Sequence, residues 1–137
     1  MPHFARVALE RSLPDHGIGY RHAPGLGGLR KPRPDSTNTG WRNVSFRGYA
    51  DYMQTDEFWV AVDDLEDLAR AQTTSIMCAE AVPWRCHRSL IADALTARGV
   101  EVRHITGPRA PSLHAMTPFG VVSGERITYP AADTLPL

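Results

Sequence analysis

The strongest constraint on the fold lies between residues 73 and 105, where the sequence has the pattern of a strand, a helix and a second strand. Thr73 to Cys78 is short, apolar and rich in β-branched residues, as buried strands are. The next segment has an apolar helical face made of Leu90, Ile91, Ala94 and Leu95. Gly99 follows where a helix end favours glycine, and Val100 to Ile105 alternates between apolar and polar residues. This βαβ pattern predicts an α/β fold with a mainly parallel sheet and a right-handed crossover.

The length and composition of the chain fit one globular domain. It has 137 residues, of which 42% are hydrophobic, and its 15 Lys and Arg balance its 15 Asp and Glu. A chain of this size can bury enough apolar surface for one core. We therefore predict a single small domain over residues 1–137, three-layered and Rossmann-like.

Cysteine content and hydropathy bear on the compartment. The chain has 2 Cys, which is too few for a secreted disulfide scaffold and favours a reducing cytoplasm. No apolar run approaches the roughly 20 residues that a membrane span needs, and no signal-peptide pattern opens the chain. We expect a cytoplasmic protein without a membrane partner.

The regions around the βαβ unit are more irregular. Weak periodicity predicts a helix over residues 3–13 and a short strand from Ile18 to His22. Residues 23–44 are rich in Gly and Pro and carry several basic side chains, which predicts an irregular basic loop. At the other end we predict a hairpin over residues 121–129 and a loose tail over residues 131–137.

Two amphipathic helices are expected between the basic loop and the βαβ unit. Asn43 or Ser45 can cap the first, whose apolar face lies within residues 46–53. Thr55 can cap the second, whose apolar face lies within residues 58–69. We expect the aromatic residues of both helices to pack in the core.

A candidate reactive site lies between residues 77 and 89, where the predicted strand leads into the helix. Ligands bind at the carboxyl ends of strands in open α/β sheets, and a helix start attracts anions. Cys86 is placed at that helix start, next to Arg85, His87 and Arg88. Positive charge there favours the thiolate, so we expect a lowered pKa for Cys86. Cys86 is thus a candidate nucleophile or redox residue, and His87 a candidate proton carrier.

Two further residues complete the candidate catalytic set. Cys78 is a candidate resolving partner for Cys86, and Glu80 is a candidate acid or base within a few residues of both. We expect the protein to bind a small anionic ligand, a nucleotide or phosphate ester, at the strand–helix junction. The groups expected to hold it are Arg85, Arg88, Ser89, Gly27, Gly28, Arg30 and Arg47.

Each of these residues also has an ordinary structural interpretation. A cysteine that ends a buried strand is usually a small core residue, and one at a helix start often caps or packs. A histidine such as His87 commonly donates to a nearby carbonyl, and Glu80 could be a solvated loop carboxylate. Arg85 and Arg88 would then only neutralise nearby carboxylates.

Other functions stay open beside the anion-binding hypothesis. The first is Cys-dependent enzyme or thiol redox chemistry at Cys86. The second is a metal site using Cys78, Cys86 and His87, completed by His22 or His104, although the spacing matches no common zinc motif. The third is a nucleic-acid-binding module in which Trp41 stacks on a base beside the basic loop. The sequence does not identify a cofactor.

Four short motifs stand out in the second half of the chain: Cys78-Ala79-Glu80, Cys86-His87-Arg88, Leu90-Ile91-Ala92 and Gly99-Val100-Glu101-Val102. Together they closely resemble a bacterial family catalogued as domain of unknown function 488. The resemblance extends over nearly the whole chain, through Leu26-Gly27-Gly28 with Arg30, the run from Phe46 to Met53, Thr117-Pro118-Phe119 and Thr128-Tyr129-Pro130. It implies an α/β fold and no established reaction.

The chain departs from the family pattern at its beginning. Members usually open with a strand similar to Thr-Ile-Gly-His-Ser, a helix, and a second strand ending in Asp-Val-Arg, whereas this sequence opens near Pro2. Three explanations compete for an N-terminally shortened domain: a naturally short member, a misassigned start codon or a deliberately shortened chain. Lost strands would expose a sheet edge, so we expect a homodimer or strand exchange between subunits.

Overall fold

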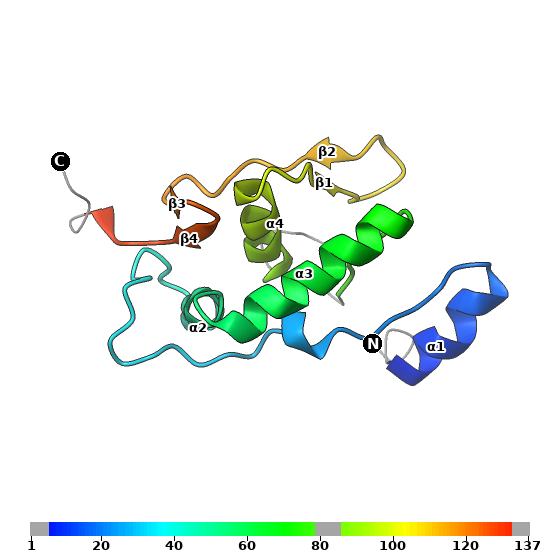
Figure 1. Ribbon diagram of the computed structural model, residues 1–137, viewed down its shortest axis with the longest axis horizontal. Coiled ribbons are helices and arrows are strands. Elements are labelled where there is room, and N and C mark those ends of the chain that lie inside the picture. The colour runs from blue at the N-terminus through cyan, green and yellow to red at the C-terminus, as the bar shows by residue number, and fades with distance from the viewer. Residues whose placement is uncertain (1–5, 79–85, 133–137) are drawn as a thin grey trace.

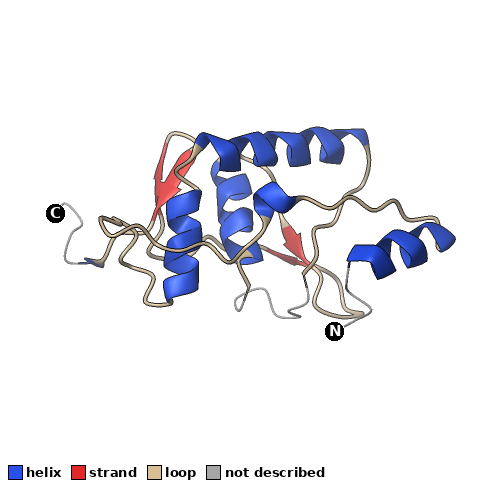
Figure 2. Cartoon of the chain, turned by 90° about the horizontal axis from the view of Figure 1, so that it is seen from below, coloured by secondary structure: helices blue, strands red, loops and turns tan. Residues whose placement is uncertain are grey.

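The computed structural model describes residues 6–78 and 86–132. Four α-helices are present in this part of the chain: α1 (Arg6–Asp15), α2 (Val44–Tyr52), α3 (Asp56–Ala71) and α4 (Arg88–Ala97). A short 3-10 turn, η2 (Pro24–Leu26), precedes α2. Helix α1 lies at one end of the molecule, apart from the other α-helices (Figures 1 and 2).

The helix boundaries follow the capping signals in the sequence. The side chain of Asn43 accepts hydrogen bonds from the backbone N–H groups of Ser45 and Phe46, at 2.9 and 3.1 Å. The hydroxyl of Thr55 accepts from the N–H of Phe58 at 3.3 Å. Both predicted caps are therefore confirmed.

The strands are short and form two antiparallel pairs. Strand β1 (Arg103–His104) pairs with β2 (Ser112–Leu113), with Arg103 opposite Leu113. Strand β3 (Val121–Ser123) pairs with β4 (Arg126–Thr128) around Gly124, whose φ is +62°. The terminal hairpin and the mixed α/β composition are confirmed.

The predicted parallel Rossmann-like sheet is not present among the described residues. Residues 73–78 form no strand there, and β1 pairs antiparallel with β2. The expected strand from Ile18 to His22 is also wrong, because that segment has no regular structure. Apolar, β-branched residues fit a pleated surface, but they form a strand only where a neighbour supplies hydrogen bonds.

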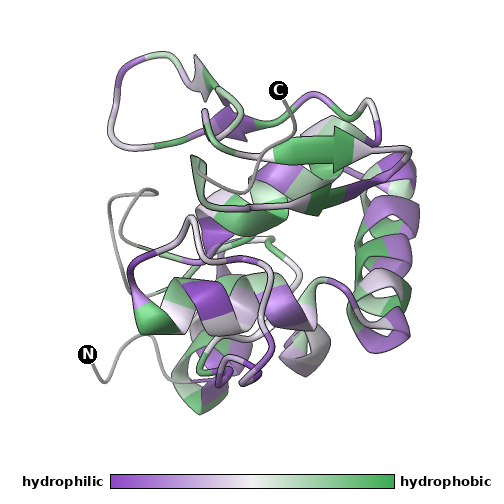
Figure 3. Cartoon of the chain, turned by 90° about the vertical axis from the view of Figure 1, so that its left-hand side faces the viewer, coloured by the Kyte–Doolittle hydropathy of each residue, from purple (hydrophilic) through white to green (hydrophobic). Residues whose placement is uncertain are grey.

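The core lies between α2, α3, α4 and β4. Its buried residues are Leu26, Tyr49, Ala50, Tyr52, Met53, Phe58, Val62, Leu90, Ile91, Ala94, Leu95, Ile127 and Tyr129. The predicted apolar face of α4 is thus buried as a whole. Figure 3 shows the helices carrying both hydrophobic and hydrophilic residues, as amphipathic packing requires. No helix in residues 6–78 and 86–132 has the length and apolar character needed to cross a membrane.

The basic loop over residues 23–44 is irregular as predicted, and side chains of α2 fasten it to the core. The hydroxyl of Tyr49 donates to the carbonyl of Leu26 at 2.8 Å, and the hydroxyl of Tyr52 donates to the carbonyl of Gly25 at 2.6 Å. Gly28 of this loop lies close to the start of α4, since a Cβ atom added there would be 3.0 Å from Nδ1 of His87.

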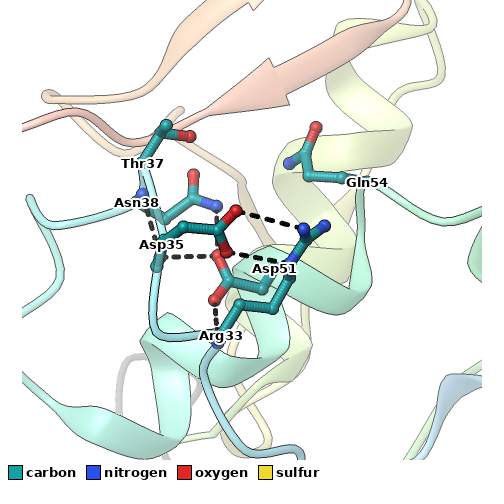
Figure 4. Close-up of a pocket in the computed structure, with 7 residues that line it drawn as sticks. Arg33, Asp35, Thr37, Asn38, Asp51 and Gln54 are labelled. Carbon is teal, nitrogen blue, oxygen red and sulfur yellow. Dashed lines mark hydrogen bonds and ion pairs between the residues drawn. The ribbon is translucent and has the colours of Figure 1, made fainter.

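A buried carboxylate fastens the second half of the loop. Asp51 accepts hydrogen bonds from the backbone N–H of Arg33, the hydroxyl of Ser36 and the amide of Asn38, at 2.8, 2.6 and 2.7 Å (Figure 4). Asn38 is itself buried and accepts from the N–H of Tyr129 at 2.8 Å. The loop is therefore hydrogen-bonded both to α2 and to Tyr129, the residue that follows β4.

Candidate functional site

The two cysteines lie together just before α4. Cys86 is buried, and its sulfur lies 2.7 Å from the sulfur of Cys78. The two are thiols and not a disulfide. The two sulfurs are therefore close enough to form a disulfide with little movement of the chain.

The environment of Cys86 favours the thiolate. Burial raises the pKa of Cys86, but hydrogen bonds from His87, Cys78 and Arg88 outweigh it and lower that pKa to about 6. The Nδ1 atom of His87 lies 3.7 Å from the Cys86 sulfur, and the backbone N–H of Arg88 donates to it at 3.5 Å. At neutral pH Cys86 is therefore mostly ionised, as the sequence predicts.

The His87 ring is held between the basic loop and α2. A Cβ atom added at Gly28 would lie only 3.0 Å from Nδ1 of His87. The ring of Tyr49 lies on another side, with its centroid 4.9 Å from that of His87. Tyr49 is buried among these groups. Burial is the main cause that raises the pKa of its hydroxyl, so Tyr49 stays neutral and packs against His87. Gly28 belongs to the Leu26-Gly27-Gly28 motif of the sequence. A larger residue at this position would crowd the ring of His87.

Replacing Gly28 by alanine is expected to raise the pKa of Cys86 by roughly one pH unit, because the new methyl group pushes Nδ1 of His87 away from the sulfur. The measurement is the rate of Cys86 alkylation as a function of pH. Gly19→Ala is the matched control, since a Cβ there meets nothing within 4 Å. An unchanged profile in Gly28→Ala would show that His87 does not set the ionisation of Cys86.

Arg88 and Ser89 begin α4 beside the thiol. Ser89 donates from its backbone N–H and from its hydroxyl to the carbonyl of Cys86, both at 3.1 Å. Ser89 thus fixes the backbone of Cys86, whereas Arg88 acts on its sulfur through main-chain and side-chain hydrogen bonds. The site accordingly combines one ionised thiol, a second thiol and an arginine at a helix start.

The remaining predicted catalytic and ligand-binding residues divide into three groups. Arg30 donates to the carbonyls of Gly27 and Pro24, both at 3.3 Å, and stacks 3.7 Å from the centroid of the Tyr52 ring. Arg47 donates to the carbonyl of Trp41 at 3.1 Å, away from the thiols in sequence. Glu80 and Arg85 lie outside the described residues.

The structure also bears on the metal and nucleic-acid hypotheses. Among the described residues, no three His, Cys, Asp or Glu side chains are grouped so as to hold a metal ion. The ring of Trp41 packs edge-on against Phe46 and Phe119, with centroids 5.1 and 4.8 Å away. Base stacking by Trp41 stays a prediction, and it would require the ring to leave this packing.

A pocket of about 150 Å³ lies between the basic loop and α2, remote from the thiols in sequence (Figure 4). Its lining residues are Arg33, Asp35, Ser36, Thr37, Asn38, Asp51 and Gln54. Both carboxylate oxygens of Asp51 already accept hydrogen bonds from the loop. The polar groups here therefore hold the loop in place.

A second polar cluster, which the sequence analysis did not predict, centres on Asp93. This carboxylate is fully buried in α4 and accepts hydrogen bonds from His114, Thr117 and Tyr129. His114 in turn contacts His104 on β1. These residues are far apart in the chain, so no local spacing brings them together. Only the unusual position of an acidic residue on the apolar face of α4 pointed to them.

A comparison of the sequence with known protein families identifies the family of this chain. The family described as "Domain of unknown function DUF488" matches residues 1–95, which include the cysteines and the start of α4. The chain belongs to this family. No curated protein and no solved structure gives a significant match. In this DUF488 protein the motif residues Cys78, Cys86 and His87 meet in one site.

Proposed function

We propose that this DUF488 protein is a thiol–disulfide redox protein in which Cys86 is the attacking thiolate and Cys78 the resolving thiol. The observation that carries the proposal is the 2.7 Å separation of the two sulfurs, one of which is ionised near neutral pH. A low thiol pKa beside a second cysteine is characteristic of redox-active pairs.

The substrate class is a disulfide of a small thiol, written RSSR. The Cys86 thiolate attacks one sulfur of RSSR, forms a mixed disulfide and releases RS⁻. Cys78 then loses its proton and attacks the Cys86 sulfur, which closes the Cys78–Cys86 disulfide and releases a second RS⁻. RSSR is reduced by two electrons, and the protein dithiol is oxidised by two electrons.

The neighbouring residues have defined parts in these steps. The hydrogen bonds of His87 and Arg88 to the Cys86 sulfur stabilise its negative charge before attack. His87 is also the nearest described base to the thiol pair, as judged by its 3.7 Å contact with Cys86. Because the sulfurs already touch, closing the disulfide requires little chain movement.

The test is reaction with dithiobis-nitrobenzoate, an aromatic disulfide that releases a coloured thiolate. Wild-type protein is expected to release one thiolate rapidly and a second as Cys78 displaces the first adduct. Cys78→Ser should keep the rapid phase and lose the second, and Cys86→Ser should lose the rapid phase. A Cys86→Ser protein that still reacts as fast as wild type, with intact folding by circular dichroism, would contradict the proposal.

A second candidate function is binding of a small anion at the same place, favoured by Arg88 at the start of α4. Inorganic phosphate is expected to raise the melting temperature of the wild-type protein and to lose this effect in Arg88→Ala. Arg109→Ala, in an exposed loop, is the control that should retain the shift. An equal shift in Arg88→Ala would place any anion site elsewhere.

A further inference from the structure

Leu29, in the basic loop, combines two features that do not stabilise the fold. Its side chain is 100% exposed, more than any other large hydrophobic residue of the described chain. Its φ is +60°, and among residues 6–78 and 86–132 no other residue except glycine has a positive φ. The left-handed region costs a leucine conformational free energy, because its Cβ atom crowds the following carbonyl oxygen. Leu29 therefore has a strained backbone and an apolar side chain without a packing contact.

A strained residue of this kind indicates a contact outside the chain. Backbone strain is concentrated at functional sites, where another molecule gains from the conformation. Single exposed apolar residues are common on protein surfaces, so exposure alone would not distinguish Leu29. Leu29 differs from such residues in its strained backbone and in its position beside the thiol site.

A series of short contacts places Leu29 near the sulfur of Cys86. Leu29 follows Gly28, and a Cβ atom at Gly28 would lie 3.0 Å from Nδ1 of His87. That nitrogen lies 3.7 Å from the Cys86 sulfur. Because consecutive Cα atoms are about 3.8 Å apart, these contacts keep the Cα atom of Leu29 within about 12 Å of the sulfur. A leucine side chain and an apolar group of a few carbon atoms can together span that distance.

Hydrogen bonds on both sides of Leu29 hold the loop in place. The hydroxyl of Tyr49 donates to the carbonyl of Leu26 at 2.8 Å, in the core. The guanidinium of Arg30 donates to the carbonyl of Gly27 at 3.3 Å. Leu29 is thus presented at a fixed place, and a substrate that packs against it has little of the loop left to order.

We propose that Leu29 determines the substrate specificity of the thiol site, by packing against an apolar R group of the disulfide that Cys86 attacks. This inference rests on the proposed redox function and names the kind of small-thiol disulfide that the site prefers. The Cys86 thiolate bonds to one sulfur of RSSR, and the other sulfur leaves with the electron pair as RS⁻. The R group on the attacked sulfur is the one beside Leu29. Burial of about 40 Å² of apolar surface in the transition state corresponds to a rate increase of roughly fivefold.

The test compares two methanethiosulfonates, R–S–SO₂–CH₃, in which R is methyl or pentyl. In both, the Cys86 thiolate attacks the sulfur that carries R and releases the same methanesulfinate anion, so charge and leaving group are matched. Loss of free Cys86 in the full chain is followed by rapid quenching and peptide mass spectrometry. The pentyl-to-methyl ratio of rate constants, divided by the same ratio for mercaptoethanol, measures the preference of the protein. Wild-type protein is expected to prefer the pentyl probe about fivefold.

Substitutions at Leu29 separate its side chain from the shape of the loop. Leu29→Asn removes the apolar side chain and supplies a residue that tolerates the left-handed region. We expect it to abolish the preference, to keep the methyl rate constant within about twofold of wild type, and not to lower the melting temperature. Leu29→Met keeps an apolar side chain of similar volume and should keep the preference.

Val122→Asn is the matched control, because Val122 is also an exposed apolar residue. It lies on the hairpin of β3 and β4, whose Glu125 pairs with Arg98 at the end of α4 opposite to Cys86. This substitution is expected to leave both rate constants and the preference unchanged.

The outcomes separate the two proposals. A wild-type protein without the preference, or a Leu29→Asn protein that keeps it, would overturn the role of Leu29. Equal slowing of both probes in Leu29→Asn would also overturn it, because Leu29 would then act only by holding Gly28 beside His87. A Cys86 that reacts with neither probe faster than an ordinary thiol would overturn the redox proposal itself. The cysteine variants in the dithiobis-nitrobenzoate assay identify that case separately.

Discussion

Replacing Gly48 by alanine is expected to lower the free energy of unfolding by about 3 kcal/mol or more. Gly48 is buried in α2, where the backbone of the basic loop crosses the helix. A Cβ atom there would collide with the carbonyl oxygen of Arg30 and would lie 2.9 Å from the carbonyl carbon of Lys31. Because these neighbours are backbone atoms, relief requires the loop to move away from α2.

The Gly48→Ala result is measured by urea unfolding followed by circular dichroism. Alanine raises intrinsic helix stability by up to about 1 kcal/mol over glycine, so a loss at this helical position would be diagnostic of the collision. Gly107→Ala is the matched control, since a Cβ there meets nothing within 4 Å. We expect it to stay within about 0.5 kcal/mol of wild type. A Gly48→Ala protein as stable as that control would show that the loop does not cross α2 as described.

Replacing Asp93 by alanine is expected to lower the free energy of unfolding by about 3 kcal/mol or more, because three donors, one buried and two part-buried, lose their acceptor. The donors are Nε2 of His114, the N–H of Thr117 and the hydroxyl of Tyr129. Asp93 itself is fully buried, so water cannot easily replace it. Through these bonds the carboxylate joins α4 to the segments that follow β2 and β4.

The same unfolding measurement tests Asp93→Ala against Asp35→Ala. Asp35 pairs with Arg33 at 3.2 Å, and both side chains are exposed to solvent. Exposed ion pairs contribute less than about 1 kcal/mol, so Asp35→Ala should change stability little. Equal effects of the two substitutions would show that the Asp93 cluster does not stabilise the fold.

Local signals in the sequence predicted the helices well. Asn43 and Thr55 cap their helices because their side-chain oxygens reach N–H groups two or three residues ahead, which needs no tertiary information. Gly99 ends the last helix with a φ of +83°, a backbone region that glycine enters without steric cost. The terminal hairpin around Gly124 is a similar local signal.

The sheet could not be predicted in the same way. Residues 73–78 have the composition of a buried strand, but pairing depends on which segment lies beside them. Residues 100–105 do alternate, yet β1 pairs with β2 only nine residues further on, in the antiparallel sense. The strand–helix–strand pattern therefore identified the helix correctly, but it was wrong about residues 73–78, which form no strand and are exposed or half-buried, and about the partner of β1.

The thiol site could be predicted in part from the sequence, whereas the Asp93 cluster could not. Cys86 precedes a helix and has basic neighbours in the chain, so its lowered pKa follows from local sequence. The role of Gly28 depends on a loop from elsewhere in the chain reaching His87. Asp93, His104 and His114 come from α4, β1 and the segment after β2, and only the packing of these elements joins them.

The pH dependence of Cys86 alkylation tests most directly whether Cys86 is an activated thiolate. The labelling is measured by peptide mass spectrometry on the reduced chain, and Cys78 in the same digest is the internal comparison. A folded-state pKa below the ordinary value means that Cys86 becomes reactive as the pH rises through about 6. We expect half-maximal labelling near that pH and a much slower reaction below it. Half-maximal labelling near the value of about 8.5 for an ordinary thiol would contradict an activated thiolate and the redox function built on it.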